Sequence, residues 1–309
     1  MIKILVTGAS GMVGRNIIES IDFQIYNLLS PSSKELNLLD LKGIQNYFQL
    51  HQPDIVIHCA GTVGGIQANI ENPVKFLVDN TQMGVNIVMA SYGSRVKKLI
   101  NLSSSCTYPK SAKNPLSEDL ILTGELEPTN EGYALAKITT AKLCEYINII
   151  DKEFNYKTLI PCNLYGKYDK FDPNHSHMIP AVIKKIDEAK NKKHPFVNIW
   201  GDGSVRREFM FVSDLVNFIA YAIINYDLIP QNINVGLGKD YSINEYYNTI
   251  SQVIGYHGQF KHDLSKPIGM KQKLMDNSKT KSLGWEAKTS LIDGIKQTYL
   301  FYKNSNKND

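Results

Sequence analysis

The chain contains 309 residues, of which 43% are hydrophobic and 21% are charged. These values are typical of a water-soluble globular protein and exclude a disordered or fibrous one, and the length predicts one large domain or two joined domains. The net charge of +4 arises from 34 basic and 30 acidic residues spread along the chain, which argues against a nucleic-acid partner.

The four cysteines, Cys59, Cys106, Cys144 and Cys162, lack a C-x-x-C spacing and are not paired with histidines at the intervals of zinc ligands. We therefore expect reduced thiols, a cytoplasmic location and no metal site. The chain opens directly on an apolar strand pattern, and it has no run of 18 apolar residues. Neither a secretion signal nor a membrane-spanning helix is expected.

Short runs of β-branched and aliphatic residues alternate with helix-forming segments in the first half of the chain. The expected strands are 2–7, 23–29, 55–60, 98–103 and 158–163. Continuous apolar strands separated by amphipathic helices are typical of a parallel sheet that is covered on both faces. The sequence therefore predicts an α/β fold with a Rossmann-type, doubly wound parallel sheet.

Two long helices are expected over residues 72–92 and 130–150. Their apolar residues cover too much of the circumference for helices that contact only a sheet. We expect each helix to bury a second face against another copy of the chain. The sequence thus predicts a homodimer formed through these two helices.

The pattern changes after Gly166, where a polar loop rich in Asp, His and Asn begins. A helix over 179–193 and a strand over 196–200 follow, and Ser242 with Glu245 forms a capping box before another helix. We expect residues 1–165 to form the Rossmann domain and residues 166–309 to form mainly a smaller C-terminal α/β substrate domain. The run 232–237 is expected to return to the first sheet as a strand.

The first expected strand leads into a glycine-rich turn and then a helix. The turn reads Gly8-Ala9-Ser10-Gly11-Met12-Val13-Gly14, at the position of a dinucleotide fingerprint. Small residues allow the backbone to approach a pyrophosphate, which the helix N-terminus stabilises. Such a turn also occurs without a ligand, where glycine only supplies a positive φ. At the first turn of an α/β chain we favour cofactor contacts from Gly8, Ser10, Gly11, Met12, Val13 and Gly14.

The stretch after the second expected strand bears on the choice between NAD and NADP. NAD enzymes place an acidic residue there to bind the ribose 2′-hydroxyl. This chain has no carboxylate in the stretch before Glu35 and offers Ser32, Ser33 and Lys34, which suit a 2′-phosphate. We therefore predict NADP, used as NADPH, with Asp40 as a candidate contact to the adenine amino group. A serine-rich turn without a ligand is the alternative.

A Y-x-x-x-K pair, Tyr133 and Lys137, falls on the helix expected over 130–150. The i, i+4 spacing puts the phenol and the ammonium on one face. A nearby cation lowers the pKa of a tyrosine, so that the phenol can exchange a proton with a carbonyl oxygen at neutral pH. Such pairs are common on solvated helices. Here the pair follows a strand that ends in Ser103-Ser104-Ser105, at the carboxyl edge of the predicted sheet, which favours a carbonyl reductase.

Several further segments along the chain match one known family. They are Val63-Gly64-Gly65-Ile66, Ser104-Ser105-Cys106-Thr107-Tyr108-Pro109-Lys110, Glu127-Pro128-Thr129-Asn130-Glu131, Asn163-Leu164-Tyr165-Gly166, His177-Met178-Ile179-Pro180-Ala181, Trp200-Gly201-Asp202-Gly203 and Arg206-Arg207-Glu208-Phe209. With the glycine turn, these segments resemble the extended short-chain dehydrogenase/reductase family, above all its members that epimerise and reduce GDP-linked sugars. The resemblance extends over most of the chain.

The resemblance implies catalytic roles for five residues. Tyr133, Lys137 and Ser104 match the reductase triad, in which the tyrosine protonates the C4 oxygen, the lysine biases its pKa and the serine orients the carbonyl. Cys106 and His177 match the epimerisation pair, which removes and returns protons at the carbons flanking the ketone. Taken alone, Cys106 would be interpreted as a buried structural thiol.

The resemblance also implies binding residues. Cofactor contacts are expected from Ala60, Gly61, Lys137, Asn163 and His177. Contacts to the GDP-sugar are expected from Val63, Gly64, Asn163, Lys185, Trp200 and Arg207. Lys185 would equally suit a solvated helix face. His175 and His177 suggest a metal clip, but H-x-H without a third ligand at fixed spacing favours catalysis over metal binding.

The implied reaction is the NADPH-dependent conversion of a GDP-4-keto-6-deoxy sugar by C3/C5 epimerisation and C4 reduction, with GDP-L-fucose as the expected product. One alternative is a C4 reductase or epimerase-reductase that acts on a GDP-4-keto-6-deoxy-heptose or another GDP-sugar for surface polysaccharide. Another is a redox-silent NADP-binding regulatory protein, which would normally lack Tyr133 or Lys137. Phe211 stands where the family usually has histidine, and Lys185 where arginine is frequent, so we expect a somewhat different sugar pocket. Ser10 stands where family members often have an arginine that helps to bind the 2′-phosphate, which weakens the expectation of NADP.

Overall fold

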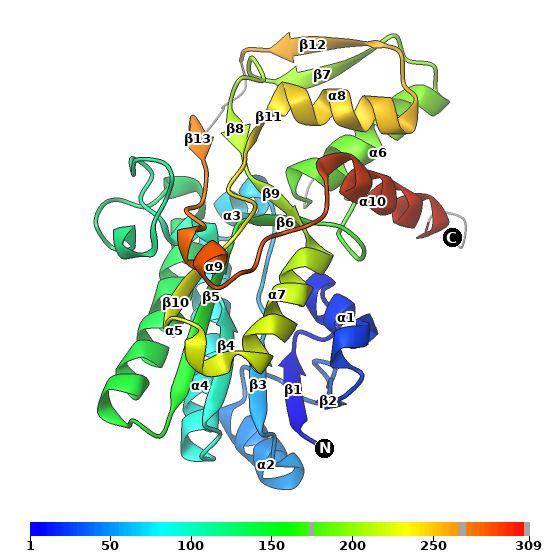
Figure 1. Cartoon of the computed structure of the whole chain (residues 1–309). Helices are drawn as coiled ribbons and strands as arrows, with labels where there is room; N and C mark the ends of the chain where they lie inside the picture. Colours follow the sequence, from blue (N-terminus) through cyan, green and yellow to red (C-terminus); the bar gives the residue numbers. More distant parts are fainter. Residues whose placement is uncertain (173–175, 266–269, 306–309) are drawn as a thin grey trace.

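A parallel six-stranded sheet forms the centre of the structure (Figure 1). The structure is a computed structural model that describes residues 1–172, 176–265 and 270–305. The strand order is β10-β5-β4-β3-β1-β2, and every neighbouring pair is parallel. The strands are β1 (Lys3–Thr7), β2 (Asn27–Leu29), β3 (Ile55–His58), β4 (Lys98–Leu102), β5 (Asn155–Pro161) and β10 (Asn232–Val235).

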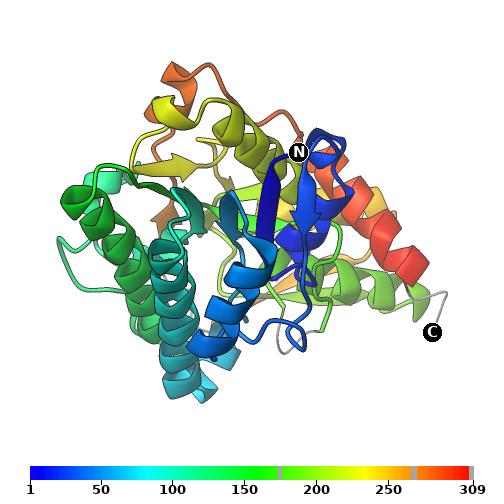
Figure 2. The ribbon, with the colours of Figure 1, turned by 90° about the horizontal axis from the view of Figure 1, so that it is seen from below.

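Helices cover both faces of this sheet. One face packs against α2 (Leu41–His51), α4 (Pro73–Gly93) and α5 (Glu131–Ile150), and the other against α1 (Met12–Glu19) and α7 (Val212–Ile224) (Figures 1 and 2). Because successive strand residues point to opposite faces, Leu5 packs on the α4 side while Ile4 and Val6 pack on the α7 side. Both faces are buried, which explains the continuous apolar strands and confirms the predicted Rossmann-type sheet.

Two predicted strands differ from those of the structure. The run 23–29 contributes only Asn27–Leu29, because Ile21–Phe23 forms a short 3-10 helix whose Phe23 is buried in the core. The run 158–163 begins earlier, since β5 includes Asn155, Tyr156 and Lys157, which look polar in sequence. Its last predicted residue belongs to another strand, β6 (Asn163–Tyr165). An apolar residue in the sequence predicts a buried side chain well, but it does not predict where a strand begins or ends.

A second core lies beside the sheet, at the top of Figure 1. It is formed by α6 (Met178–Asn191), β7 (Phe196–Trp200), α8 (Ile243–Ile254), β12 (Gln259–Asp263) and α10 (Leu291–Ser305). β7 and β12 pair in parallel. The predicted capping box is present at α8, where Ser242 Oγ accepts a hydrogen bond from the Glu245 N–H at 3.2 Å and the Glu245 carboxylate accepts one from the Ser242 N–H at 2.7 Å.

Short strands join the two cores. β6 pairs with β9 (Phe209–Phe211), and β8 (Arg206–Arg207) lies between β11 (Tyr241–Ser242) and β13 (Gln272–Lys273). Two short helices complete the described elements, α3 (Ile66–Glu71) before α4 and α9 (Ser278–Ser282) beside β10. No helix within the described ranges combines the length and the apolar character needed to cross a bilayer.

The edge strand β10 is tied to the loop that follows β4. The hydroxyl of Tyr108 donates a hydrogen bond to Asn234 Oδ1 at 2.5 Å. The N–H of Asn234 donates to the carboxylate of Glu118 at 2.9 Å. All three residues are buried. These bonds fix the loop that carries the Ser-Ser-Cys segment against a strand contributed by the second half of the chain.

Candidate active site

The turn after β1 lies at the carboxyl edge of the sheet, and its glycines leave the backbone there uncovered by side chains. Gly8 has φ +69°, and a Cβ there would lie 2.7 Å from the backbone of Ala60. A Cβ at Gly14 would lie 2.3 Å from the carbonyl oxygen of Gly8. Gly11 begins α1 without a side-chain cap, so the N–H groups of the first helical turn remain available for an anion. The turn therefore fits the pyrophosphate of a dinucleotide.

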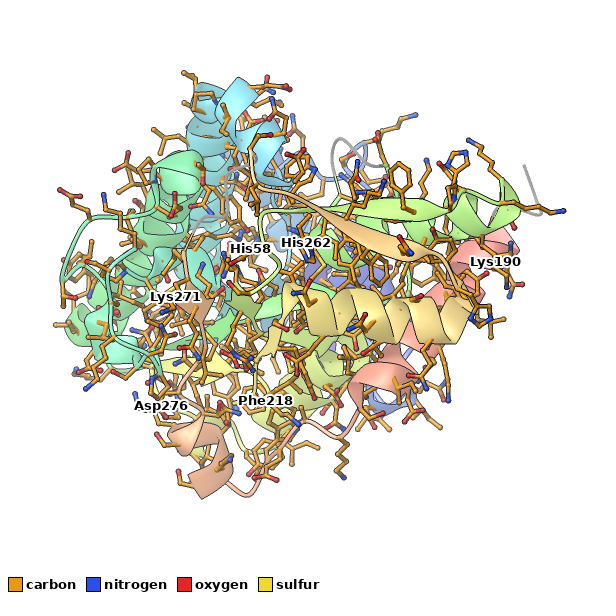
Figure 3. The ribbon with its side chains drawn as sticks, turned by 90° about the horizontal axis from the view of Figure 1, so that it is seen from above. His58, Lys190, Phe218, His262, Lys271 and Asp276 are labelled. Carbon is orange, nitrogen blue, oxygen red and sulfur yellow. The ribbon has the colours of Figure 1, made fainter. Side chains whose placement is uncertain are left out.

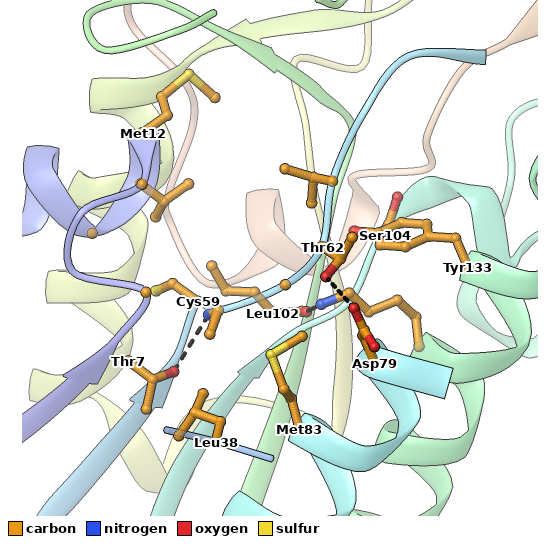
Figure 4. A pocket seen from close by; sticks show the side chains of 18 of the residues that line it. Thr7, Met12, Leu38, Cys59, Thr62, Asp79, Met83, Leu102, Ser104 and Tyr133 are labelled. Carbon is orange, nitrogen blue, oxygen red and sulfur yellow. Dashed lines mark hydrogen bonds between the residues drawn. The ribbon is translucent and has the colours of Figure 1, made fainter. Parts of the chain in front are cut away.

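A cavity of about 480 Å³ extends from this turn across the carboxyl edge of the sheet (Figure 4). Its lining includes the predicted cofactor residues Gly8, Ser10, Gly11, Met12, Val13, Gly14, Ser33, Ala60 and Gly61. It also includes Val63, Gly64, Ser104, Tyr133, Lys137, Asn163 and His177. Residues that are far apart in sequence thus share one cavity, whose volume is in the range usual for ligand pockets.

The predicted 2′-phosphate segment is only partly in this cavity. Ser33 lines it, whereas Ser32 and Lys34 are exposed outside its lining. The carboxylate of Glu35 accepts a hydrogen bond from the Ser32 N–H at 2.7 Å. Asp40 also lies outside the lining, where its carboxylate caps α2 by accepting from the Gly43 N–H at 3.1 Å. The carboxylate of Glu35 therefore lies within the segment that was expected to bind the 2′-phosphate, which its position after Lys34 did not indicate.

The reductase residues meet where β4 ends and α5 begins. Lys137 Nζ donates a hydrogen bond of 2.8 Å to the carbonyl oxygen of Leu102 and lies 5.7 Å from the centroid of the Tyr133 ring. Ser104 follows β4 in an extended conformation and lines the same cavity as Tyr133, and Figure 4 labels both residues. A phenol, a hydroxyl and an ammonium are therefore grouped at one wall of the cavity.

Burial dominates the electrostatics of this group. It lowers the pKa of Lys137 to about 8. It raises the pKa of Tyr133 above its usual value, and the nearby Cys106 raises it further. The expected lowering of the Tyr133 pKa is therefore wrong for the protein without ligands, because burial would remove the phenolate from water. Tyr133 is accordingly a protonated phenol, the form required of a proton donor.

The two predicted epimerisation residues lie on different elements. Cys106 is buried beside Tyr133, and its N–H donates to Ser104 Oγ at 3.3 Å. Burial raises the pKa of the Cys106 thiol. His177 is the residue before α6 and lines the cavity. Burial by the surrounding protein lowers the pKa of His177, and Lys170 lowers it further.

Three predicted GDP-sugar residues lie outside the cavity lining. Lys185 on α6 donates to the carbonyl oxygen of Asn198. Trp200 ends β7 with 60% of its surface exposed, and Arg207 on β8 donates to the carbonyl oxygen of Arg206 at 2.8 Å. Asn163, in contrast, lines the cavity and donates to the carbonyl oxygen of Glu208 at 3.1 Å. Lys185, Trp200 and Arg207 belong to the elements of the second core and its connections.

The cavity includes residues that the sequence analysis missed. Leu38 and Leu39 line its nucleotide end, and Asn69, Phe76 and Asp79 line the part near Val63. Asn69 is buried, and its Oδ1 atom has no hydrogen-bond partner among the residues that the structure describes. These residues stand in segments of ordinary composition that carry no recognisable motif.

In the described ranges, no three His, Cys, Asp or Glu side chains lie close enough together to hold an ion. His175, the other half of the H-x-H pair, lies outside the described residues. All four cysteines are free thiols.

Two curated relatives are similar to this chain along its whole length. GDP-L-colitose synthase of Yersinia pseudotuberculosis is 58% identical over 307 residues, which cover 99% of this chain and 100% of the relative. GDP-L-fucose synthase of Azorhizobium caulinodans is 49% identical, with coverage of 99% and 97%.

Among solved structures, the GDP-mannoheptose C4 reductase from Campylobacter jejuni with NADP bound superposes with a TM-score of 0.88. It is 32% identical and covers 98% of both chains. The family model described as NAD dependent epimerase/dehydratase family matches residues 4–236, which contain the glycine turn, Ser104, Tyr133 and Lys137. These matches confirm the resemblance that the motifs indicated. The chain belongs to the NAD dependent epimerase/dehydratase family.

Proposed function

We propose that this protein is an NADPH-dependent epimerase-reductase that converts a GDP-linked 4-keto-6-deoxy sugar by C3/C5 epimerisation and C4 reduction. The observation that carries the proposal is the shared cavity, in which Ser104, Tyr133 and Lys137 face the glycine turn. A regulatory protein that only bound the nucleotide would have no use for this arrangement. The named activities of the curated relatives support the same class of reaction.

In the reduction, Tyr133 donates its proton to the C4 oxygen while Ser104 holds that oxygen by a hydrogen bond. Lys137, held by Leu102, stabilises the phenolate that the proton transfer leaves behind. When bound, the nicotinamide cofactor supplies the hydride. The glycine turn binds its pyrophosphate, and Ser33 lies at the end where the 2′-phosphate of NADP would be. The NADP-bound reductase of similar fold supports this choice of cofactor.

In the epimerisation, Cys106 and His177 exchange protons with the carbons flanking the ketone. Inversion requires a base and an acid on opposite sides of the sugar, because return of the proton to the same face changes nothing. Cys106 approaches Tyr133 from the loop after β4, and His177 enters the cavity from the start of α6. Their positions on separate elements support different roles for the two residues, although Cys106 itself is not part of the cavity lining.

Two hexose products and one larger substrate are candidates. GDP-L-fucose requires inversion at both C3 and C5. GDP-L-colitose contains a 3,6-dideoxy sugar, whose C3 is not a stereocentre, so only C5 would be inverted. The relative that is 58% identical is a GDP-L-colitose synthase, which makes this product the direct competitor of GDP-L-fucose. A GDP-4-keto-6-deoxy-heptose is the third candidate, supported by the similar fold of the GDP-mannoheptose reductase.

The deciding experiment offers the purified protein NADPH in D₂O with each of the three GDP-4-keto sugars in turn. NMR and mass spectrometry of the products would reveal which sugar is reduced and at which carbons deuterium is incorporated. We expect reduction of a hexose with deuterium at C5, and at C3 if the substrate bears a C3 hydroxyl. If none of the three sugars causes oxidation of NADPH, the assignment is contradicted. If a sugar is reduced without incorporation of deuterium, the protein is a simple C4 reductase.

We also propose that the protein is a homodimer. Exposed apolar residues form a stripe on α4 at Val74, Val78 and Met89, and another on α5 at Tyr146 and Ile150. The two helices pack side by side at one edge of the molecule (Figure 2). A second copy would cover both stripes with its own pair of helices, as is usual for two-fold symmetric interfaces. Val78→Arg should yield monomers by sedimentation, whereas Ile224→Arg on α7 should not.

The two cores suggest which part of the chain binds each ligand. We assign residues 1–165, with the strand around 232–237, to NADP and residues 166–309 mainly to the GDP-sugar, whose contacts would come from Lys185, Trp200 and Arg207. The four free thiols support a reducing compartment, so we place the protein in the cytoplasm.

A further inference from the structure

Polar side chains form a row across the central sheet, with one residue on each of four strands. Thr7 of β1 pairs in register with His58 of β3, and His58 pairs in register with Asn101 of β4. Asn101 in turn pairs with Thr158 of β5. All four side chains are buried, and Figure 3 labels His58 near the middle of the molecule. Because neighbouring strands lie about 4.8 Å apart, each side chain is within reach of the next.

The row lies on the face of the sheet that α4 and α5 cover. Successive strand residues point to opposite faces, so residues two positions apart share a face. The residues two positions before the members of the row all belong to the apolar core on the α4 and α5 side, and they are Leu5, Val56, Leu99 and Tyr156. A polar side chain in an apolar core destabilises the fold unless it is hydrogen-bonded. We therefore expect the members of the row to bond to one another.

The first link is a hydrogen bond of 2.8 Å between Thr7 Oγ1 and His58 Nδ1. The Ala60 N–H also donates to Thr7 Oγ1, at 3.3 Å (Figure 4). Among the described residues, His58 Nδ1 is the acceptor available to the hydroxyl hydrogen of Thr7, and a buried donor left without an acceptor is costly. Thr7 therefore donates to Nδ1, which places the proton of a neutral imidazole on Nε2. Burial, followed by the charge of Lys137, lowers the pKa of His58 to about 3, so the ring is neutral at neutral pH.

The link at the other end of the row joins Asn101 to Thr158. Asn101 Nδ2 donates to Thr158 Oγ1 at 3.4 Å. A carboxamide presents its oxygen and its nitrogen in different directions, so Asn101 Oδ1 is directed away from β5. This oxygen is buried and has no hydrogen-bond partner in the part of the chain that the structure describes. The neighbouring strand on that side carries His58, whose Nε2–H is a donor.

The members of the row stand just before the segments that line the active-site cavity. Thr7 precedes the glycine turn, His58 precedes the segment 59–64, and Asn101 precedes the segment 102–104. The residue after Asn101 is Leu102, whose carbonyl oxygen accepts the hydrogen bond from Lys137. A shift of one of these strands along its neighbour would therefore move the glycine turn relative to the catalytic side chains.

We propose that His58 is a positioning residue for the reduction, which joins Thr7 to Asn101 as a neutral imidazole protonated on Nε2 and thereby fixes the carboxyl ends of β1, β3 and β4. The Nε2–H donates to Asn101 Oδ1, directly or through one buried water. His58 is not part of the cavity lining, so it acts through the segments that are. This role deepens the proposed function and rests on it for its kinetic consequences.

The first test measures the state of the imidazole in the ligand-free protein, without any reaction of a sugar. NMR of protein with ¹⁵N-labelled histidine shows which ring nitrogen carries a proton, and the His58→Gln variant identifies the signals of His58. We expect a protonated Nε2 and an unprotonated Nδ1 that do not change between about pH 5 and 8, whereas an ordinary exposed histidine titrates near about pH 6.5. A proton on Nδ1, or titration of His58 in this range, would overturn the proposed role.

The second test separates positioning from stability. His58→Leu leaves the Thr7 hydroxyl and the Asn101 amide without their partner, so it should lower both the stability against urea and kcat for ketone reduction. His58→Leu/Asn101→Leu also removes the orphaned amide, and an apolar pair of similar size should restore most of the stability. We expect kcat of this double variant to stay at least about tenfold below that of the wild type, because small misplacements of reacting groups are costly. If kcat returns to the wild-type value together with stability, the row only stabilises the fold and the inference fails.

A matched pair of variants at the other end of the bond provides the control. Thr7→Ser keeps the hydroxyl and should retain most of the rate, whereas Thr7→Val removes it and should lower kcat. Circular dichroism checks the fold, and this pair replaces the leucine variants if those do not fold. If Thr7→Val turns over as fast as Thr7→Ser, the bond to His58 has no positioning role. If the wild type oxidises NADPH with none of the three GDP-4-keto sugars, the proposed function fails, while the NMR measurement still decides the state of His58.

Discussion

Lys137 Nζ is anchored on Leu102, the last residue of β4, by a hydrogen bond of 2.8 Å. The bond links the catalytic helix to the sheet and holds the ammonium beside the Tyr133 ring. Because burial lowers the pKa of Lys137 to about 8, the charge on this anchor changes within the range where enzymes are assayed.

The reductase activity should therefore decline at alkaline pH. Below about pH 8 Lys137 is an ammonium that stabilises the Tyr133 phenolate as it forms, and above that pH the charge is lost. We expect kcat/KM for ketone reduction to fall with an apparent pKa near 8 when measured from pH 6 to 10. A profile that stays flat through pH 9 would contradict this role of Lys137.

The same group should affect stability with a definite sign. Its pKa is lower in the folded protein than in the unfolded chain, so the cost of burying the ammonium is present below about pH 8 and disappears as the pH rises toward 10.5. Lys137→Met should thus stabilise the protein against urea more at pH 7 than at pH 10. Lys142→Met, on the same helix, serves as the control.

Removal of the Tyr133 hydroxyl should abolish reduction and spare cofactor binding. Tyr133→Phe loses only the proton donor, and general acid catalysis contributes about 10²–10⁴-fold, so we expect kcat to fall by a factor in that range. The dissociation constant of NADPH, measured by its fluorescence, should stay within about twofold. Tyr146→Phe, which changes an exposed tyrosine on the same helix, should behave as the wild type.

Cys106 and His177 should separate the two halves of epimerisation. Cys106→Ser should stop deuterium from entering the sugar, because a hydroxyl is far less acidic than a thiol, and should preserve C4 reduction. His177→Asn should allow deuterium exchange with little net inversion, because abstraction survives and proton return does not. If Cys106→Ser exchanges deuterium as fast as the wild type, another residue is the base.

Glu35 should weaken the preference for NADPH. Its carboxylate accepts hydrogen bonds from Ser32, and the bond from the backbone lowers the pKa of Glu35 more than the bond from the side chain does. The group is therefore ionised beside the expected 2′-phosphate. Surface charge pairs contribute little, so Glu35→Gln should raise the ratio of kcat/KM for NADPH over NADH only about two- to fivefold. The control is Glu153→Gln at a distant ion-pair cluster. A lower ratio would mean that Glu35 supports the loop rather than opposing the phosphate.

The sheet could be predicted because its strands are buried on both faces. Ile4, Leu5 and Val6 alternate between two cores, so all three had to be apolar. The ends of strands were less predictable, as Phe23 illustrates, since a buried 3-10 turn has the same composition as a strand. The glycine turn could be located because Gly8 and Gly14 tolerate no side chain.

The sequence predicted those site residues that form a local pattern or match the family, and it missed the others. Tyr133 and Lys137 are four residues apart, so their helix alone brings them together. Glu35 turns back on Ser32 through a loop conformation that the sequence does not encode in any simple period. Lys273 lies opposite Arg207 on a strand far along the chain, and only the pairing of β13 with β8 reveals it. For Glu35 the missing information was a local loop conformation, and for Lys273 it was long-range proximity.

The position of β10 has a consequence for the biosynthesis of the protein. Until this late strand leaves the ribosome, β5 is an open edge with unpaired N–H and C=O groups, which invites association with other chains. Tyr108 and Glu118 also lack their partner Asn234 during this interval. The nucleotide-binding half therefore cannot mature as an independent unit while the chain is being made. Premature termination before residue 232 would produce an aggregation-prone fragment rather than a functional dinucleotide-binding domain.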